Sequence, residues 1–213
     1  MAARPPKASA AAVARRAARI RLVGLDVDGV LTDGRLYFGA RGEMFKAFDV
    51  RDGLGIQLLR SAGIVVAIVT GRNSPIVAAR ARDLGITHVL QGQRDKHASL
   101  QRLMAGNGVA AGECAFMGDD WPDLAVLGCV GLATTVADAP EEVRARVHWV
   151  APSAGGRGAV RDLTSLLLRA QGRFDALFDA ALQAAPFVAA PGADGTVPTP
   201  RGRRPAGRGS ARG

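Results

Sequence analysis

Two aspartates, Asp26 and Asp28, stand at alternate positions at the end of an apolar run, in the stretch GLDVDGVLTDG. If that run is a strand that continues through them, both side chains lie on one face of it. Carboxylates held so close repel each other unless a cation or a shared proton lies between them. The pair therefore indicates either a metal site or a chemical role, and residues elsewhere in the chain must decide which.

More polar side chains follow later apolar runs. Thr70 closes the run IVVAIVT, Asp119 and Asp120 follow the run ECAFM, and Lys96 opens a predicted helix between these two runs. The acids could not all ionise together without a cation. Because carboxylate oxygens with no clustered His or Cys are the ligands that magnesium prefers, we expect a magnesium site.

Such a set of groups can support phosphoryl transfer. A carboxylate beside magnesium can attack a phosphorus atom and form an aspartyl-phosphate. A second carboxyl two residues on can protonate the leaving oxygen and later deprotonate the water that hydrolyses the intermediate. Lys96 and Thr70 can hold the transferring group and offset its charge.

The elements that must bring these residues together alternate between strands and helices. Short β-branched runs predict buried strands, and Ser-Pro starts and Gly ends mark helices between them. The expected strands are 20–27, 64–70, 87–92, 113–120, 129–134 and 147–151, and the expected helices are 52–63, 74–85, 95–105, 121–127, 140–146 and 158–171. This alternation predicts an α/β fold with a doubly wound, mainly parallel sheet, in which ligands lie outside the carboxyl ends of the strands.

Residues 35–48 interrupt the alternation. Two short extended segments flank Gly39 and Gly42 and predict a β-hairpin that is rich in large apolar side chains. Because an isolated hairpin is only marginally stable, we expect it to pack on something else, such as another subunit. After the last predicted helix, the pattern of 173–183 leaves open whether that helix continues.

The net charge of +9 comes from the two ends of the chain. Residues 1–21 and 185–213 together carry +10, which leaves 22–184 close to neutral at −1. We expect a basic N-terminal extension with a short helix (1–19), one folded domain (20–184) and a disordered, Arg-rich tail (185–213). The basic ends can attract polyanions weakly, but no specific nucleic-acid partner is expected.

Two cysteines, Cys114 and Cys129, fall in predicted strands and lack metal-ligand spacing. Both are expected to be small core residues in a reducing compartment, which favours the cytoplasm. No apolar stretch approaches ~18 residues, so no membrane span or membrane partner is expected. The Arg- and Ala-rich N-terminus also has the composition of an organellar transit peptide, which stays open as an alternative.

Taken in order, DVDGVLTDG, IVTGR, Lys96 and GDDWPD resemble the haloacid dehalogenase-like phosphatases. Within that superfamily, the chain resembles the 3-deoxy-D-manno-octulosonate (KDO) 8-phosphate phosphatases over roughly residues 20–175. The closer resemblance rests on DVDGVLTDG, the hairpin, FDVRDGLGI, VTGR, LGITHVLQGQRDK, MGDDWPDLAVL, VGLATTVADA and AGGRGAVRDL. The resemblance implies Mg²⁺-dependent hydrolysis of this sugar-acid phosphate, in the synthesis of a lipopolysaccharide precursor.

The resemblance also implies roles for matching residues. Asp26 would be the nucleophile and Asp28 the general acid and base. Magnesium would be held by the Asp26 carboxylate, the Asp28 main-chain carbonyl and Asp119. Thr70 and Lys96 match the positions that stabilise the phosphate.

Further positions follow from the same resemblance. Asp120 and Asp123 complete the second acidic motif, with Asp123 supporting the ligands from behind rather than binding the metal. The carboxylate of the sugar acid would be gripped near Arg51, Arg72 and Arg157, because guanidinium groups bind carboxylates in a bidentate manner.

Quaternary structure is implied as well. Members of the family have no cap domain over the site, and this chain likewise has no insertion of that size. They are homotetramers in which the hairpins form a central barrel and a neighbour helps to close the site. That arrangement would explain the apolar hairpin at 35–48.

Three other interpretations stay open from the sequence. A receiver domain of a response regulator shares the fold and the phosphorylated aspartate, but it has no acid two residues later, where this chain has Asp28. A non-catalytic domain of the same fold would have altered acids, and here they are intact. An active phosphatase for another sugar-acid phosphate, such as a sialic-type 9-phosphate, differs only in pocket size, which one sequence does not give.

Overall fold

A six-stranded parallel sheet forms the centre of the computed structural model, which describes residues 8–184. The strand order is β5-β4-β1-β6-β7-β8, and each neighbouring pair runs parallel. The strands are β1 (Leu22–Leu25), β4 (Val65–Val69), β5 (His88–Leu90), β6 (Cys114–Met117), β7 (Leu132–Thr135) and β8 (Trp149–Val150). The predicted mainly parallel α/β fold is confirmed, although each strand is shorter than the run that predicted it.

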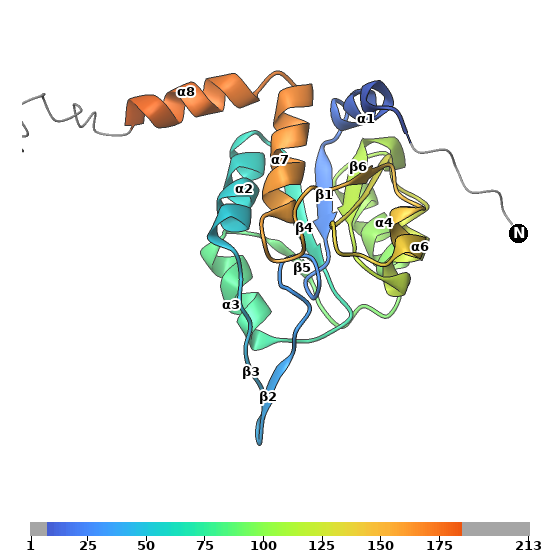
Figure 1. The fold of residues 1–213 in the computed structure, drawn as a ribbon, viewed down its shortest axis with the longest axis vertical. Coiled ribbons are helices and arrows are strands. Elements are labelled where there is room, and N and C mark those ends of the chain that lie inside the picture. Colours follow the sequence, from blue (N-terminus) through green and yellow to red (C-terminus); the bar gives the residue numbers. More distant parts are fainter. Residues whose placement is uncertain (1–7, 185–213) are drawn as a thin grey trace, which may run out of the picture.

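Helices cover both faces of this sheet (Figure 1). On one face α7 packs between α1 and α2, and on the other α4 packs against α5. The helices are α1 (Ala10–Ala17), α2 (Val50–Ser61), α3 (Pro75–Asp83), α4 (Lys96–Gly106), α5 (Leu124–Leu127), α6 (Glu141–Arg144), α7 (Ala159–Ala170) and α8 (Phe174–Ala184), with short 3₁₀ turns η1 (Ala111–Glu113) and η2 (Trp121–Asp123).

The core lies on both sides of the central strands. Every residue of β1, β6 and β7 is buried, as expected for strands covered by helices on both faces. Phe116 of β6, Leu22 of β1 and Leu163 of α7 are fully enclosed. Because this core holds the middle of the sheet rigid, the carboxyl ends of β1, β4 and β6 are fixed relative to one another.

The predicted hairpin is present and projects away from the domain beyond those carboxyl ends (Figure 1). It consists of β2 (Tyr37–Gly39) and β3 (Gly42–Phe45), with the Tyr37 and Phe45 rings stacked at 4.2 Å. Phe38 is 58% exposed and Met44 65% exposed. Large apolar side chains at a projecting tip are typical of a protein contact.

The structure corrects one expectation and resolves one point that the sequence left open. Cys129 is exposed in the turn between α5 and β7 rather than buried in a strand, because the chain turns at Gly128 before β7 begins at Leu132. The segment 173–183 does not continue α7, since Gly172 takes a positive φ of 65° and a separate helix, α8, follows.

Some expectations concern segments that the structure does not cover. Residues 1–7 and the predicted disordered tail, 185–213, lie outside the described residues, so the division of the chain into three parts stays a prediction. The expected short helix near the N-terminus is present as α1. Among residues 8–184, no helix combines the length and hydropathy that a membrane span requires.

One buried acid ties the first turns of α2 and α7 together. Asp52 is 1% exposed, and its two oxygens accept hydrogen bonds from the backbone N–H groups of Gly158 at 3.2 Å and Arg161 at 2.8 Å. These N–H groups belong to the start of α7, where no helical partner exists. Asp52, a residue of α2, therefore caps the N-terminus of α7.

Replacing Asp52 by Ala should lower the free energy of unfolding by about 2 kcal/mol, because two buried N–H groups lose their acceptor. Chemical denaturation with far-UV circular dichroism measures the change. The control is Asp179→Ala on α8, an exposed acid whose loss should cost less than about 0.5 kcal/mol. Equal stabilities for the two variants would show that the cap contributes nothing.

Candidate active site

The site lies where the strand order of the sheet reverses. From β1 the chain passes to β4 and β5 on one side, then crosses over to β6 on the other side of β1. Open parallel sheets bind ligands at such a switch point, outside the carboxyl ends of the strands. Asp26 directly follows β1, and Asp119 follows β6 by two residues. The backbone N–H of Asp26 still donates to Met117 O at 3.0 Å, which keeps the two strand ends together.

The chain turns immediately after Asp26. The carbonyl of Val27 accepts hydrogen bonds from the N–H groups of Val30, Leu31 and Thr32, which closes a tight turn. Asp28 is therefore part of a turn rather than of a continued strand, and the alternation that would place both aspartates on one strand face does not apply. The two carboxylates instead have different partners.

Lys96 is the partner of Asp26. Its buried ammonium lies 2.7 Å from Asp26 Oδ2 and 2.7 Å from Asp123 Oδ1. Asp95 caps α4 by accepting from the N–H of Ala98, so Lys96 occupies the first position of that helix, as predicted. Burial alone would lower the pKa of Lys96, but the carboxylates of Asp26 and Asp123 outweigh it and raise the pKa. The lysine is thus held as a cation.

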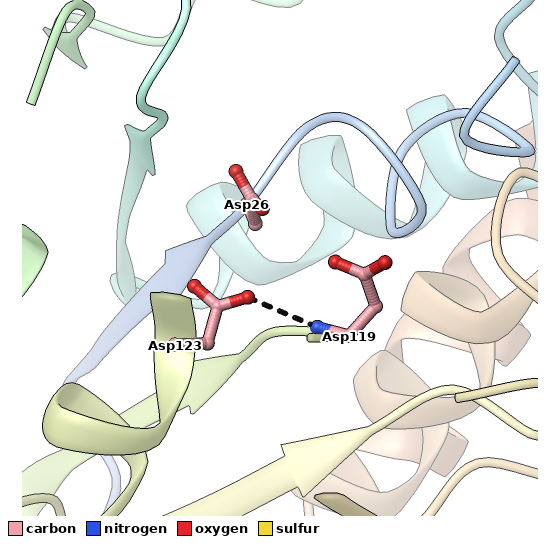
Figure 2. Close-up of side chains that lie close together, drawn as sticks. All are labelled: Asp26, Asp119 and Asp123. Atoms are coloured by element: carbon pink, nitrogen blue, oxygen red, sulfur yellow. Dashed lines mark hydrogen bonds between the residues drawn. The ribbon is translucent and has the colours of Figure 1, made fainter. Parts of the chain in front are cut away.

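Asp123 uses both carboxylate oxygens for contacts within the protein. Oδ1 accepts from Lys96, and Oδ2 accepts from the backbone N–H of Asp119 at 3.1 Å (Figure 2). The side chain is completely buried. Asp123 therefore orients both Lys96 and the loop that carries Asp119. The supporting role expected for Asp123 stays a prediction.

Asp119 faces the turn after β1. Figure 2 shows its carboxylate beside those of Asp26 and Asp123, and carboxylate oxygens of all three lie within 4.8 Å of one another. Gly29, with a φ of 87°, makes the close approach possible, since a Cβ there would lie 2.0 Å from Asp119 Oδ2. The backbone that follows Asp28 thus runs directly against the Asp119 carboxylate.

Proton affinities at the site reflect this crowding. Burial and the charge of Asp123 raise the pKa of Asp26 to about 6, because the opposing effect of Lys96 compensates only in part. Burial and the charges of Asp26 and Asp123 raise the pKa of Asp119 to about 7. One ammonium does not balance three carboxylates, so the cluster favours either protons or a second cation.

This donor set fits Mg²⁺. The cluster offers carboxylate oxygens, the ligands of a hard divalent cation. Both oxygens of Asp123 already accept hydrogen bonds, and Asp26 Oδ2 is paired with Lys96. The ligand set expected from the sequence, the carboxylates of Asp26 and Asp119 with the Asp28 main-chain carbonyl, stays a prediction.

Thr70 lies at the same edge of the sheet, one residue after β4. Its side chain is buried, its N–H donates to Leu90 O and its carbonyl accepts from Gln93 N, both at 2.9 Å. These bonds clamp it between β4 and the loop after β5. Its hydroxyl accepts a long hydrogen bond, 3.4 Å, from the N–H of Arg72.

Asp28 is surrounded by residues of the hairpin and of the loop after β4. Lys46, which directly follows β3, forms an ion pair with Asp28 Oδ1, and Arg72 Nε lies 3.6 Å from Asp28 Oδ2. Lys46 also lies 2.9 Å from Glu43 Oε1, and the Ser74 hydroxyl donates to Glu43 Oε2. The structure thus brings Arg72, one of the expected substrate contacts, next to Asp28.

Arg51 and Arg157 lie together at the start of α2 and α7. The Arg51 side chain binds Asp49 at 2.7 Å and the Arg157 carbonyl at 2.7 Å. Among the contacts of the described residues, neither arginine side chain reaches the acidic cluster. The loop that carries Arg157 does reach the site, since Gly156 N donates to Val30 O in the turn after Asp28.

Asp120 is the expected site residue with the least connection to the others. It is exposed, and its carboxylate accepts from the N–H of Trp121 at 2.8 Å, which caps the η2 turn. Through that cap it shapes the backbone between Asp119 and Asp123. Asp120 and Asp123 also form a reciprocal capping box, in which each side chain accepts from the backbone N–H of the other.

Sequence reasoning missed Lys46 and Glu43. The prediction for the hairpin rested on its aromatic and aliphatic residues, and it assigned no role to the charged ones. The available signal was weak: a Glu and a Lys three residues apart, where the alternation of a hairpin places apolar side chains.

Comparisons with known proteins show the family to which the chain belongs. No protein-family model matches the chain. The KDO 8-phosphate phosphatase of Yersinia pestis is 46% identical over 163 residues, which cover 76% of this chain and 87% of the relative. A haloacid dehalogenase superfamily hydrolase of subfamily III A from Legionella pneumophila has 40% identity and a TM-score of 0.78, covering 81% of this chain and 95% of that one.

One solved structure adds ligands to the comparison. The KDO 8-phosphate phosphatase of Moraxella catarrhalis, in complex with a magnesium ion, a phosphate ion and KDO, has 40% identity and a TM-score of 0.79. The match covers 81% of this chain and 99% of that chain. The identity and coverage of the Yersinia pestis relative show the family, and the expectation from the motifs is confirmed. This chain belongs to the KDO 8-phosphate phosphatases of the haloacid dehalogenase-like superfamily.

Proposed function

We propose that this protein is a Mg²⁺-dependent phosphatase that hydrolyses KDO 8-phosphate to KDO and inorganic phosphate. The observation that carries the proposal is the buried contact of Lys96 with both Asp26 and Asp123 beside Asp119, at the switch point of the sheet. The family supplies the substrate, since the Moraxella catarrhalis relative was solved with magnesium, phosphate and KDO.

In the proposed first step Asp26 is the nucleophile. Lys96 pairs with Asp26 Oδ2, so Oδ1 is the oxygen left to attack phosphorus. As the new O–P bond forms, the P–O bond to the sugar breaks, and the leaving oxygen takes a proton from Asp28. Lys96 and Thr70 hold the transferring phosphoryl group and offset its charge.

The second step releases phosphate. The Asp28 carboxylate takes a proton from a water molecule, and the water oxygen attacks the phosphorus of the aspartyl-phosphate. The bond to Asp26 breaks, which restores its carboxylate, and Asp28 regains its proton. Mg²⁺, when held by Asp26, Asp119 and the Asp28 carbonyl, neutralises the charge of the phosphate and of the buried acids.

Arginines at the edge of the site are proposed to bind the carboxylate of the sugar acid. Arg72 is the best supported of them, because its half-exposed side chain reaches Asp28. Arg51 and Arg157 extend the proposed contact along the start of α2 and α7. Lys96 would meet the phosphate end of the same molecule.

We further propose that the protein is a homotetramer assembled through its hairpins. The support is the apolar tip formed by Phe38, Met44 and Phe45, which the described part of one chain leaves exposed. A cytoplasmic location completes the proposal, and the two cysteines support it, because neither is in a disulfide.

The first test of the function is substrate preference together with loss of the nucleophile. Phosphate release from KDO 8-phosphate in Mg²⁺ should exceed release from a sialic-type 9-phosphate by at least about tenfold in kcat/KM, and chelator should abolish both. Asp26→Asn should lower kcat by at least ~10³-fold, because the amide oxygen is a poor nucleophile.

The matched control is Asp83→Asn, an exposed acid on α3 that pairs with Arg80. It should keep the activity of the wild type, and both variants should keep the fold by circular dichroism. Undiminished turnover in Asp26→Asn would refute the nucleophile assignment. A preference for the sialic-type 9-phosphate would show that the substrate assignment is wrong, while the proposed phosphatase mechanism would still stand.

The pH dependence of stability should reveal the metal site. Folding raises the pKa of Asp26 and Asp119 above the ordinary value of 3.8, so the folded chain binds protons more tightly than the unfolded chain. The contribution of these two carboxyl groups to the free energy of unfolding is complete below about pH 4. It is lost as the pH rises through 6 to 7. In chelator, Tm should therefore fall between about pH 5 and about pH 8.

Mg²⁺ should raise Tm more at about pH 8 than at about pH 5, because it replaces protons at the same oxygens. At a concentration of 100 times its Kd, Mg²⁺ should raise the free energy of unfolding by about 2.7 kcal/mol. The Asp119→Asn variant should lose most of this gain, measured by differential scanning calorimetry. An equal effect of Mg²⁺ at both pH values would contradict the site.

Placing a charge at the hairpin tip should break the tetramer. Met44→Glu should reduce the mass in light scattering, because a carboxylate buried at an apolar contact lacks a partner. Leu182→Glu on α8 is the matched control, since Leu182 is 60% exposed and far from the hairpin in the chain. If Met44→Glu stays tetrameric, the hairpin is not the contact.

A further inference from the structure

Lys46 is buried where a hairpin lysine would normally be solvated. Lys46 is 9% exposed, whereas its neighbour Phe45 is 50% exposed. Lysine side chains are almost never fully buried unless they are paired. Here the partners are Asp28 and Glu43, so the burial of an ammonium at the base of the hairpin is compensated by two carboxylates.

Glu43 anchors this lysine to a third segment of the chain. Its Oε1 lies 2.9 Å from Lys46 and 3.9 Å from Arg72, and its Oε2 accepts from the Ser74 hydroxyl at the start of α3. The network therefore joins the turn after β1, the hairpin and the loop after β4. A surface ion pair with no other function would not require three segments to converge.

The charges of this network balance without a metal ion. When Asp28 is ionised, it and Glu43 carry two negative charges, and Lys46 and Arg72 carry two positive ones. The acidic cluster of Asp26, Asp119 and Asp123 differs, because within residues 8–184 Lys96 is the one cation paired with any of its three acids. The side chain of Asp28 is therefore held apart from the proposed metal ligands.

We propose that Lys46 is a positioning residue for Asp28: it holds Oδ1, with Arg72 beside Oδ2, and so fixes the direction that the carboxyl group faces. The proposal rests on the proposed function, in which Asp28 is the general acid and base. In the first step the proton of the Asp28 carboxyl group goes to the leaving sugar oxygen as the P–O bond breaks. In the second step the Asp28 carboxylate takes a proton from water.

The leaving group of the substrate separates this role from a merely structural one. The sugar alkoxide is strongly basic and needs a proton to leave, whereas 4-nitrophenolate leaves without one. If Lys46 aims the proton donor, its loss should slow release of the sugar far more than release of 4-nitrophenolate. A loosened fold would slow both alike.

The experiment is single-turnover release of KDO from KDO 8-phosphate and of 4-nitrophenolate from 4-nitrophenyl phosphate, with Mg²⁺ and the full-length chain. Lys46→Met should slow KDO release by ~10²-fold and nitrophenolate release by less than about threefold, with KM for KDO 8-phosphate changed less than about threefold. Lys46→Arg should recover at least about tenfold of the loss, because it restores a donor to Asp28.

A second variant guards against misfolding. Lys46→Met removes the ammonium that faces Asp28 and Glu43. The double variant Glu43→Gln with Lys46→Met removes one charge of each sign. It should slow KDO release far more than nitrophenolate release, as the single variant does. Equal slowing of both esters in these variants overturns the positioning role and leaves the proposed function standing. A wild type that cleaves only the nitrophenyl ester overturns the proposed function and the inference with it.

Discussion

A buried ammonium between two carboxylates is the interaction on which this site depends. Lys96 reaches Asp26 and Asp123 at 2.7 Å each, and Asp123 in turn holds the backbone of Asp119. Removing Lys96 would leave buried carboxylates without their cation, which is strongly destabilising. The parallel sheet tolerates the cluster because its well-packed centre fixes the carboxyl ends of β1 and β6. The fold thus supplies the rigidity, and the remaining excess of negative charge supplies the affinity for a divalent cation.

Two aspartates that are two residues apart receive different environments from the same turn. Asp26 faces Lys96 and the acidic cluster, whereas Asp28 faces Lys46 and Arg72. Enzymes that use paired acids in different roles separate them by environment. Here the tight turn at Val27 creates the separation, and Gly29 lets the backbone pass close to Asp119. A nucleophile and a proton carrier can therefore sit side by side without sharing a proton.

Much of the fold and part of the site could be predicted from the sequence because they depend on local patterns. Buried β-branched runs and helix caps predicted the parallel sheet, and the ends of those runs predicted the edge at which Asp26, Thr70 and Asp119 meet. The prediction for Cys129 was wrong because the apolar residues around Gly128 gave no sign of the turn there. Lys46 was missed because its partner Asp28 lies across a turn and a hairpin, a contact that no periodicity encodes. The roles of Arg51 and Arg157 stay predictions, since in the described part of the chain neither side chain contacts the acidic cluster.

Proton release on Mg²⁺ binding tests the central claim most directly. Calorimetric titration of Mg²⁺ into the metal-free protein near pH 6, in two buffers with different heats of ionisation, counts the protons displaced. The raised pKa values of Asp26 and Asp119 predict release of roughly one proton per ion, and Asp26→Asn should diminish it. Binding of Mg²⁺ without any proton release, or no binding at all, would contradict an acidic cluster that exchanges protons for a metal ion.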